Sequence, residues 1–481
     1  MSQLPSLIEG FRPQRLFLRP HARVEVDGVF VRVSKEGDTE SWIPAEGGYL
    51  IKTEDLLQDP SIIRSARVST DRDTTEVSEK AQGLVNFLHR DNHATPSEGG
   101  VMFRLRWETP ISFAQPLFRL FASHNEFSGR YSKIDGSYYR PGFVEGDVAT
   151  EFDRAEEEAQ GLYEKLLSLG VAGEMARYVH LYRFYTKFYM TVSARELINF
   201  LSWQNVAERP GPDFAEVREL VGEILQTWTP WLSKANATHP RRLDFSWIQD
   251  QEYLGDGPIE KMSSLQQRFA LDHGEVRVLD FYGNDDMCLA ALDDFPNPAQ
   301  AFDHAGITMY LKMPIHVFRQ WVRHRKGHWT EFMPDFDRIV GDNLFYLPER
   351  FRKQEGKVGA YTYSPMNDDE NAQVASLVKE HYVQCRKRYQ RLVQNLRLLP
   401  TMAALNLPYS FYITALRTEP LGGAFNFLSL RADSHAQAEF KPYVAAEWHA
   451  VKTYFPKSAK IFAKYLHYGN NQEIKDYGLS E

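Results

Sequence analysis

Apolar residues are arranged along this chain in two similar series, each made of a short apolar run followed by a long helical pattern. The turn-bounded apolar runs 101–107 and 306–313 each predict one β-strand. Residues 151–169 carry apolar side chains at every third or fourth position and stop at Gly170, which predicts a long helix. The same pattern over 368–399 predicts a second one. We therefore expect an α+β fold in each half, with an antiparallel or mixed sheet and long helices.

Short strings of sequence recur in the same order in the two halves. Asn199 begins the string NFLSW, and Asn426 begins NFLSL 227 residues later. Pro110 and Pro314, each followed by Ile and then a nearby Gln, form a second pair 204 residues apart. The preserved order predicts a tandem duplication of a domain of about 200 residues. We expect an N-terminal extension at 1–55, a first half at 56–245, a linker at 246–274 and a second half at 275–481.

Composition narrows the class of protein. The 56 Lys and Arg against 64 Asp and Glu give a net charge of −8, which argues against bulk nucleic-acid binding and makes any basic site local. The two cysteines, Cys288 and Cys385, cannot form a disulfide framework or a Cys-based zinc site, so we expect a reducing compartment and no metal. The N-terminus lacks an apolar core of signal-peptide length, and no run of about 18 apolar residues occurs. These features predict a cytoplasmic protein without a membrane segment.

The densest basic cluster is the string RQWVRHR, from Arg319 to Arg325. Pro314 is a good first-turn residue for a helix, and on a helix Arg319 and Arg323 would be neighbours. Guanidinium groups bind phosphate through paired hydrogen bonds, so this face suits a phosphorylated ligand. The alternative is a solvated helix face that carries surface ion pairs.

A polar loop in the first half, residues 123–132, offers a second candidate. Ser128, Gly129 and Arg130 in succession allow a close backbone approach, a hydroxyl contact and a guanidinium contact with phosphate. A turn stabilised by Asn and Ser side chains would have the same sequence.

The third candidate follows the second NFLS string. Arg431, Ser434 and His435 would share one face of a helix, which is unusual directly after a buried segment. The alternative is a buried ion pair between Arg431 and Asp433 that fixes packing.

These segments together resemble the motifs of the flavin-dependent thymidylate synthase family. The family string RQWFRHRxASxNExSGRYS is divided here, because 319–325 resembles its start and 122–132 resembles its end. Residues 426–439, NFLSLRADSHAQAE, resemble the family's C-terminal string NARSLxNFLxLRxDSHAQxE, and residues 93–96 resemble the start of its HxTPFEH string. The resemblance covers roughly residues 55–245 and 275–470.

Each half has lost motifs that the other retains. The first half has FRLF from Phe118 where Arg-His-Arg is expected, and Gln204 where the second half has Arg431. The second half has Met-Pro-Asp from Met333 in place of Ser-Gly-Arg. In this family the sites lie between subunits of a homotetramer. The resemblance therefore implies that two unlike halves build one complete site, and that a homodimer of the tandem chain is a pseudo-tetramer.

The resemblance implies an enzyme that transfers a one-carbon unit from methylenetetrahydrofolate to C5 of a uracil nucleotide, converting dUMP to dTMP, with FAD as cofactor and NADPH as reductant. The implied catalytic residue is Arg431. The implied substrate-binding residues are Gln320, Arg323, Glu126, Phe127, Ser128, Gly129, Arg130 and Arg177. The implied flavin-binding residues are His93, Thr95, Glu126, Ser193, Arg195, Asn199, Arg323, His324, Arg325 and Asn426, although His93 could equally be a structural histidine.

Arg431 decides the chemistry because an arginine beside the pyrimidine favours its N3-deprotonated form. A guanidinium about 4 Å away at an effective dielectric constant of ~20 is worth roughly 4 kcal/mol, or about three pKa units. Ala404, where the first half has Arg177, and His328, where the family has Ser, favour a related flavin- and folate-dependent enzyme acting on another pyrimidine nucleotide or an RNA uridine. The many altered motif positions also leave open a non-catalytic flavin or nucleotide binder.

Overall fold

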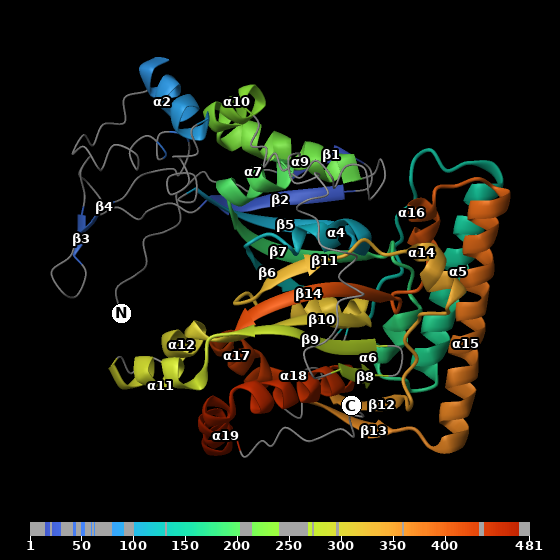
Figure 1. Cartoon of the computed structure of the whole chain (residues 1–481). Helices are drawn as coiled ribbons and strands as arrows, with labels where there is room; N and C mark the ends of the chain where they lie inside the picture. The colour runs from blue at the N-terminus through green and yellow to red at the C-terminus, as the bar shows by residue number, and fades with distance from the viewer. Residues whose placement is uncertain are drawn as a thin grey trace, which may run out of the picture. The chain divides into compact units, whose positions relative to one another are not determined.

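The computed structural model describes residues 15–19, 22–29, 42–44, 50–52, 59, 62, 79–90, 101–129, 132–202, 214–239, 268–271, 274–294, 298–357, 360–431 and 437–470. These residues form two compact units (Figure 1). The first unit lies within 1–128, 135–144 and 183–244, and the second within 129–134, 145–182 and 245–481. The second unit therefore includes two segments from the first half of the sequence.

The first unit is built on a five-stranded antiparallel sheet. Along β5 the buried side chains Phe103, Leu105 and Trp107 alternate with more exposed ones, as one covered sheet face requires. The helices of this unit are α2 (Glu79–Arg90), α4 (Ile111–Leu117), α7 (Ala194–Ser202), α9 (Phe214–Trp228) and α10 (Pro230–Thr238). The strand order is β1 (Arg15–Arg19), β2 (Ala22–Val29), β5 (Met102–Pro110), β7 (Tyr185–Ser193) and β6 (Ser123–Glu126).

The second unit has a sheet of the same size and order, whose strands run side by side in Figure 1. Its strands are β8 (Arg268–Leu271), β9 (Gly274–Tyr282), β10 (Gly306–Pro314), β14 (Tyr412–Pro420) and β11 (His328–Glu331). Its helices include α11 (Asp285–Asp294), α13 (Ile315–Trp321), α17 (Leu421–Arg431), α18 (Lys441–Tyr454) and α19 (Pro456–Asn470).

The two sheets have the same register. Pro110 pairs with Tyr185 in the first sheet, and the equivalent Pro314 pairs with Tyr412 in the second. The edge strands β6 and β11 also have equivalent registers. His124 of β6 pairs with Met190 in the first sheet, and Trp329 of β11 pairs with Arg417 in the second. A shift of one residue would turn every side chain to the opposite face, so identical register indicates a common origin. The prediction of an α+β fold in two tandem copies is confirmed.

The segment expected to be an N-terminal extension contributes to the first sheet. The strands β1 and β2 occupy the places that β8 and β9 take in the second sheet. The expected linker, 246–274, contains β8 and the first residue of β9.

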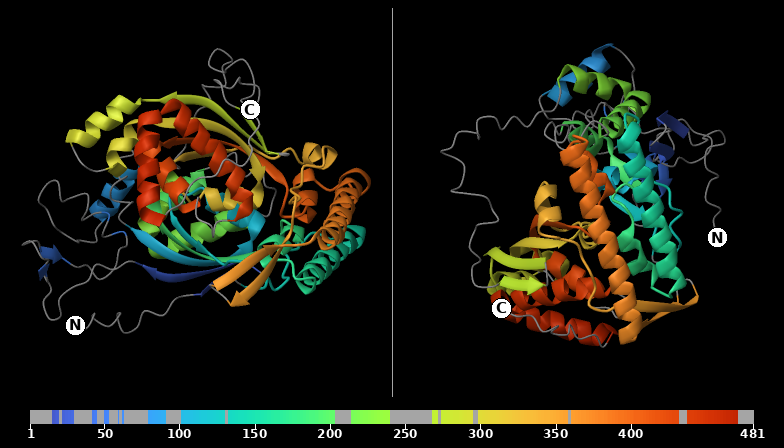
Figure 2. Two further views of the ribbon diagram at one scale, coloured as in Figure 1. Left: turned by 90° about the horizontal axis from the view of Figure 1, so that it is seen from below. Right: turned by 90° about the vertical axis from the view of Figure 1, so that its right-hand side faces the viewer.

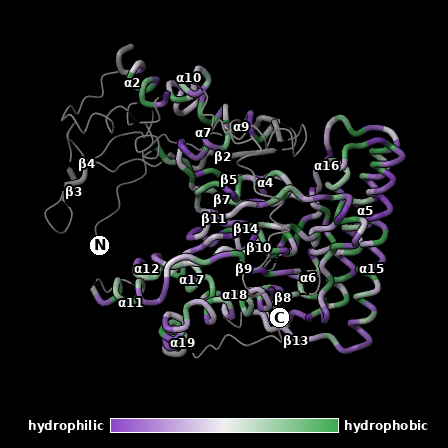
Figure 3. Tube along the Cα trace, in the orientation of Figure 1, coloured by the Kyte–Doolittle hydropathy of each residue, from purple (hydrophilic) through white to green (hydrophobic). Residues whose placement is uncertain are grey.

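Two 23-residue helices, α5 (Gly146–Ser168) and α15 (Asp368–Gln390), pack against each other in the second unit (Figure 2). Both alternate hydrophobic and hydrophilic residues along their length (Figure 3). The buried Arg388 of α15 lies 3.6 Å from Glu151 and 2.5 Å from Glu158 of α5. These ion pairs join helices from the two halves of the sequence. None of the helices in the described ranges has the length and apolar character needed to cross a membrane.

The second long helix is shorter than the sequence pattern predicts. It starts at a capping box, in which Asn367 accepts from the backbone N–H of Glu370 and the Glu370 side chain accepts from that of Asn367. It ends at Gln390, a π-helical turn follows over Arg391–Asn395, and Arg397 then turns the chain with φ of 58°. The predicted helix over 368–399 is therefore wrong in its last turns, because apolar periodicity continues beyond the point where the backbone reverses.

One side-chain feature is repeated in the two copies. Asp285 accepts hydrogen bonds from the backbone N–H groups of Lys457 and Ser458, both at 2.8 Å, at the start of α19. The equivalent Asp59 accepts from the backbone of Trp231 and Leu232 at the start of α10, at 2.6 and 3.1 Å. Each aspartate satisfies amide groups that have no partner within the helix.

We predict that Asp285→Ala lowers the free energy of unfolding by about 1–2 kcal/mol, because a nearly buried cap is lost. Urea denaturation followed by circular dichroism measures the change. The matched control is Asp286→Ala, which removes an exposed carboxylate that pairs with the side chain of Lys457. Equal losses in the two variants would contradict the capping role.

Candidate functional site

A segment of the first half brings two polar residues into the second unit. The short helix α6 (Gly173–Ala176) carries Glu174, and the 3-10 turn η2 (Arg177–Val179) begins with Arg177. The backbone of this segment is held at both ends by second-half residues, since Ala172 N–H donates to Arg352 O at 2.8 Å and Tyr182 N–H to Leu407 O at 2.8 Å. Arg177 is thus fixed among residues of the second half.

Gln437 joins the candidate nucleotide residues of the two halves. Its Oε1 accepts from Nε2 of Gln320 at 2.5 Å and from Nη2 of Arg177 at 3.4 Å. Its Nε2 donates to Oε2 of the fully buried Glu174 at 3.3 Å. Arg177 also donates from Nε to the backbone oxygen of Glu174 at 3.2 Å. The second unit therefore brings Gln320 and Arg177 together, and Ala404, at the position equivalent to Arg177, is buried.

A hairpin inserted in the second half supplies a buried cation beside this group. The hairpin consists of β12 (Arg352–Lys357) and β13 (Ala360–Pro365). Nη2 of Arg352 lies 2.9 Å from Glu174 and 3.2 Å from Glu439. Burial alone would lower the pKa of Arg352, but the attraction of Glu439 and Glu174 outweighs it and raises that pKa. Arg352 therefore stays charged and holds two buried carboxylates.

A second group, rich in positive charge, surrounds His324. Nε of Arg431, at the end of α17, donates to Nε2 of His324 at 3.3 Å. Burial, followed by the charges of Arg431, Arg417 and Arg323, lowers the pKa of His324 to about 3. Burial and Arg323 also lower the pKa of both Arg325 and Arg431 to about 10. His324 is therefore neutral, and its guanidinium neighbours repel one another.

The predicted helical face of Arg319 and Arg323 is wrong. Helix α13 ends at Trp321, so Arg323 lies in the following turn, and Arg319 is only 1% exposed. The helix turns Arg319 toward the core, as it does the neighbouring His316 and Phe318. Arg323, His324 and Arg325 are half-buried in this turn, whereas Arg319 is buried.

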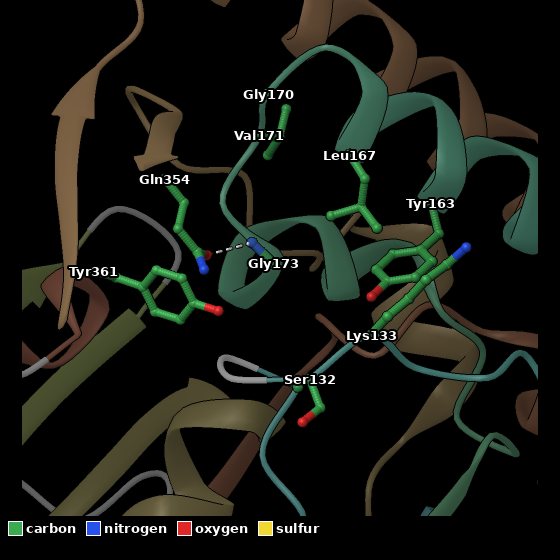
Figure 4. A pocket seen from close by; sticks show the side chains of 10 residues that line it. Ser132, Lys133, Tyr163, Leu167, Gly170, Val171, Gly173, Gln354 and Tyr361 are labelled. Carbon is green, nitrogen blue, oxygen red and sulfur yellow. Dashed lines mark hydrogen bonds between the residues drawn. The ribbon is translucent and has the colours of Figure 1, made fainter. Parts of the chain in front are cut away.

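A cavity of about 250 Å³ lies beside the loop that contains Gly129 (Figure 4). Gly129 belongs to the predicted phosphate loop, and a methyl group there would lie 3.5 Å from Cδ of Arg177. The hydroxyl groups of Tyr163 and Tyr361 point into the space between them in Figure 4. The cavity is lined by Gly129, Ser132, Lys133, Tyr163, Leu167, Gly170, Val171, Gly173, Gln354 and Tyr361.

Several predicted residues lie in the first unit. Ser193 caps α7 by accepting from the backbone N–H of Glu196 at 3.2 Å, and Asn199 donates to Glu196 at 3.1 Å. Glu126 accepts from the hydroxyl of Thr186 at 2.8 Å. Arg195 and Phe127 are exposed, and Ser128 is half-buried. In the second unit Asn426 is exposed on α17.

Other predicted residues lie outside the described ranges. These are His93, Thr95, Arg130, Ser434 and His435, together with Asp433 of the alternative ion pair. Gln437 and Glu439 stood in the string 426–439 and Glu174 lies three residues before Arg177, but the sequence assigned none of the three a role. Arg352 had no signal in the sequence at all, because it belongs to an insertion that the first half lacks. Within the described ranges, no group of three His, Cys, Asp or Glu side chains is placed to hold a metal ion.

The chain as a whole is similar to a known protein family. The model of the family described as thymidylate synthase complementing protein matches residues 53–231 and again residues 296–457. The chain belongs to this family. The match in two regions confirms both the resemblance drawn from the motifs and the tandem arrangement of two copies.

Individual relatives of the family agree. A flavin-dependent thymidylate synthase of Thermotoga neapolitana is 32% identical over 197 residues, which cover 39% of this chain and 90% of that protein. The enzyme of the same name from Ruegeria pomeroyi is 27% identical over 220 residues, covering 40% of this chain and 72% of the relative. The relatives are enzymes, as the sequence motifs led us to expect.

A solved structure is also similar to part of the chain. It is a UMP/dUMP methylase, PolB, from Streptomyces cacaoi bound with 5-Br dUMP. The sequence identity is 23% with a TM-score of 0.36, over 46% of this chain and 96% of that protein.

We predict that Arg352→Ala destabilises the protein by about 3–5 kcal/mol, because it leaves Glu174 and Glu439 buried without their cation. Guanidinium denaturation measures the loss. Arg338→Ala is the matched control, since Arg338 forms an exposed ion pair with Asp342 that is worth about 0–1 kcal/mol. Similar midpoints for Arg352→Ala and the unchanged protein would contradict a buried, charged Arg352.

Proposed function

We propose that this protein is a flavin-dependent thymidylate synthase, which transfers a one-carbon unit from methylenetetrahydrofolate to C5 of dUMP and uses NADPH as reductant. The observation that supports it best is the hydrogen bonding of Gln437 to both Gln320 and Arg177. Candidate nucleotide residues from the two halves therefore meet within one chain, as a site assembled from complementary halves requires. The named activity of the relatives supports the same reaction.

The nucleotide is proposed to bind between the basic group and the Gly129 loop. Arg177 and Arg323 provide positive charge for its phosphate. The phosphate-binding roles of Ser128 and Arg130 remain predictions. Gly129 is packed closely against Ile134, since a methyl group at this position would lie 3.1 Å from Cδ1 of Ile134. Gln320 can bind the nucleotide through its amide only in the orientation that Gln437 fixes.

The residues present fit the diphosphate of FAD. Arg323 and Arg325 crowd together strongly enough for burial and mutual repulsion to lower the pKa of Arg325 to about 10. A bound diphosphate would relieve that repulsion, and the exposed Asn426 adds an amide donor. When bound, FAD supplies the electron transfer that the chain's own side chains cannot. The predicted flavin roles of Ser193, Arg195 and Asn199 remain predictions.

Arg431 is proposed to activate the uracil ring. Its Nε is held by the neutral Nε2 of His324, which orients the planar guanidinium and leaves both Nη groups out of that bond. The ring of Phe440 lies 4.8 Å from its Cζ and fixes the other side. A guanidinium held in this way favours the N3-deprotonated pyrimidine and so increases electron density at C5. The chain needs no cysteine nucleophile, and both Cys288 and Cys385 are buried.

The second candidate is a related flavin- and folate-dependent enzyme with another pyrimidine substrate. The cavity beside the Gly129 loop favours it, because Gln354 and Tyr361 come from the inserted hairpin that the first half lacks. A substrate panel decides between the two.

We also propose that the tandem chain forms a homodimer, which light scattering would detect as twice the chain mass.

We predict that Arg431→Ala abolishes turnover while flavin remains bound. Tritium release from 5-tritiated deoxyuridylate, with methylenetetrahydrofolate and NADPH present, should fall by about 100-fold or more, since the preorganised cation is lost. The absorption spectrum should stay yellow. If the variant releases tritium as fast as the protein without the substitution, Arg431 does not have the proposed role. If the protein without the substitution releases no tritium from any pyrimidine nucleotide, the proposed function is wrong.

We predict that Arg177→Ala raises the KM for dUMP by about 10-fold, because a charge-assisted contact with phosphate is worth roughly 1.5–3 kcal/mol. Steady-state kinetics at varied dUMP measure it. Arg154→Ala, which removes an exposed arginine of α5, should leave KM unchanged. A loss of kcat at constant KM would place Arg177 away from the nucleotide.

A further inference from the structure

A charged cluster is buried in the core of the second unit, outside the residues that the proposed reaction uses. It consists of Arg417 and Glu419 on β14 and Glu447 on α18, all three with no solvent exposure. Arg417 and Glu419 form a bidentate pair, in which Nε of Arg417 lies 2.6 Å from Oε1 of Glu419 and Nη2 donates to Oε2. Buried ion pairs contribute little stability compared with apolar side chains of similar size, so the presence of this one calls for another explanation.

The sister half shows that the fold itself does not require these charges. Met190 and Val192 of β7 occupy the positions equivalent to Arg417 and Glu419, and both are fully buried. The register of the two sheets is the same, so the two pairs of residues face the same part of each core. The charges in the second half therefore need a reason specific to that half.

Arg417 is enclosed by aromatic rings that lead to His324. Its Cζ lies 4.5 Å from the ring centre of Trp329, 5.3 Å from that of Trp321 and 5.7 Å from that of Phe427. Phe427 stacks on Trp321 at 4.6 Å and meets the His324 ring edge-to-face at 5.1 Å. A guanidinium over ring faces is attracted to them, so Arg417 fixes the rings that contact the histidine.

The backbone near His324 is also packed against this cluster. A methyl group at Gly327 would lie 3.5 Å from Cζ of Arg417 and 3.0 Å from Cβ of Glu419. Gly327 follows His324 by three residues, so the turn that carries the histidine rests on the Arg417 and Glu419 pair. Larger side chains at Gly327 would push this turn away.

The surroundings of the third member, Glu447, favour its neutral form. Burial, followed by the charge of Glu419, raises the pKa of Glu447 well above its usual range. The cluster therefore contains one cation, one carboxylate and one carboxylic acid. The positive charge of Arg417 lies close enough to His324 to act on it, as do those of Arg431 and Arg323.

We propose that Arg417 is a positioning residue for Arg431: it holds the aromatic rings against His324 and disfavours a proton on that ring, so that Nε2 of His324 can accept the hydrogen bond from Arg431. A protonated imidazole would have no lone pair for that bond and would repel the guanidinium. The role in catalysis rests on the proposed function, whereas the effect of Arg417 on His324 does not.

The experiment exchanges the pair for the residues of the sister half. In Arg417→Met with Glu419→Val, both new side chains already pack at equivalent positions of the first sheet. The titration of His324 is followed by NMR of protein with ¹⁵N-labelled histidine and is assigned with His324→Gln. In the unchanged protein His324 should titrate at about pH 3. In the double variant its midpoint should rise by about half a pH unit or more, because the charge of Arg417, which acts on His324, is lost and the simultaneous loss of the Glu419 carboxylate offsets only part of that change.

Activity should follow the titration. The acid limb of the profile of kcat/KM against pH should move upward by the same amount in the double variant, with little change in KM for dUMP. Arg417→Lys keeps the charge and should keep the midpoint. Glu447→Gln should also leave the midpoint unchanged, because an amide of the same shape replaces a side chain whose neutral form is favoured.

Two results would overturn the proposal. One is a folded double variant whose His324 midpoint and acid limb are those of the unchanged protein, which would make the cluster structural only. The other is a His324 midpoint near 6.5 in the unchanged protein, a result that does not depend on the folding of any variant. If the midpoint moves as expected but no pyrimidine nucleotide is turned over by the unchanged protein, the effect on His324 stands and the proposed function fails.

Discussion

Repulsion between like charges is the constraint around which the second unit is arranged. Arg323, Arg325 and Arg431 share a half-buried region in a chain whose net charge is −8, and burial with this crowding lowers the pKa of two of them. Arg352 of the same unit is held by two buried carboxylates, which raise its pKa. The contrast separates a structural arginine, Arg352, from the arginines that we propose to bind an anionic ligand.

The neutral state of His324 depends on the same field. A histidine among carboxylates would carry a proton at physiological pH, whereas here burial and three arginines keep it uncharged. It can therefore accept a hydrogen bond from a guanidinium, which two cations could not form. The chemistry proposed for Arg431 thus depends on a residue that never needs to touch the substrate.

Much of the fold and part of the candidate site could be predicted from the sequence. The predictions that were wrong were wrong for physical reasons. Apolar periodicity found β5, β10 and both long helices, because covered sheet faces and helix stripes need regular spacing. It could not show that α13 ends at Trp321, because a helix end depends on backbone contacts that the spacing of Arg319 and Arg323 does not reveal. Motifs predicted that Arg177 and Gln320 bind the same ligand, and the structure brings the two residues together. The bridging role of Gln437 needed coordinates, since it joins residues 260 and 117 positions away in the chain.

The two copies kept their backbone and changed their chemistry. Both sheets retain one register, and Asp59 and Asp285 still cap equivalent helices. The buried positions of β7 and β14 nonetheless differ between apolar and ionic side chains. Backbone hydrogen bonds and caps are satisfied in the same way whatever the core contains, so the frame could persist while individual side chains changed.

The presence of α5 and Arg177 in the second unit has a consequence for how the molecule comes together. If the two copies were separate polypeptides, this unit would form only after a bimolecular encounter, and dilution would take it apart. Covalent linkage supplies the first-half segment that contains α5 and Arg177 at a high effective concentration. Assembly of the second unit therefore becomes part of folding. It also frees each copy from having to be self-complementary, because a fused pair, unlike two identical chains, can accumulate different residues on its two sides.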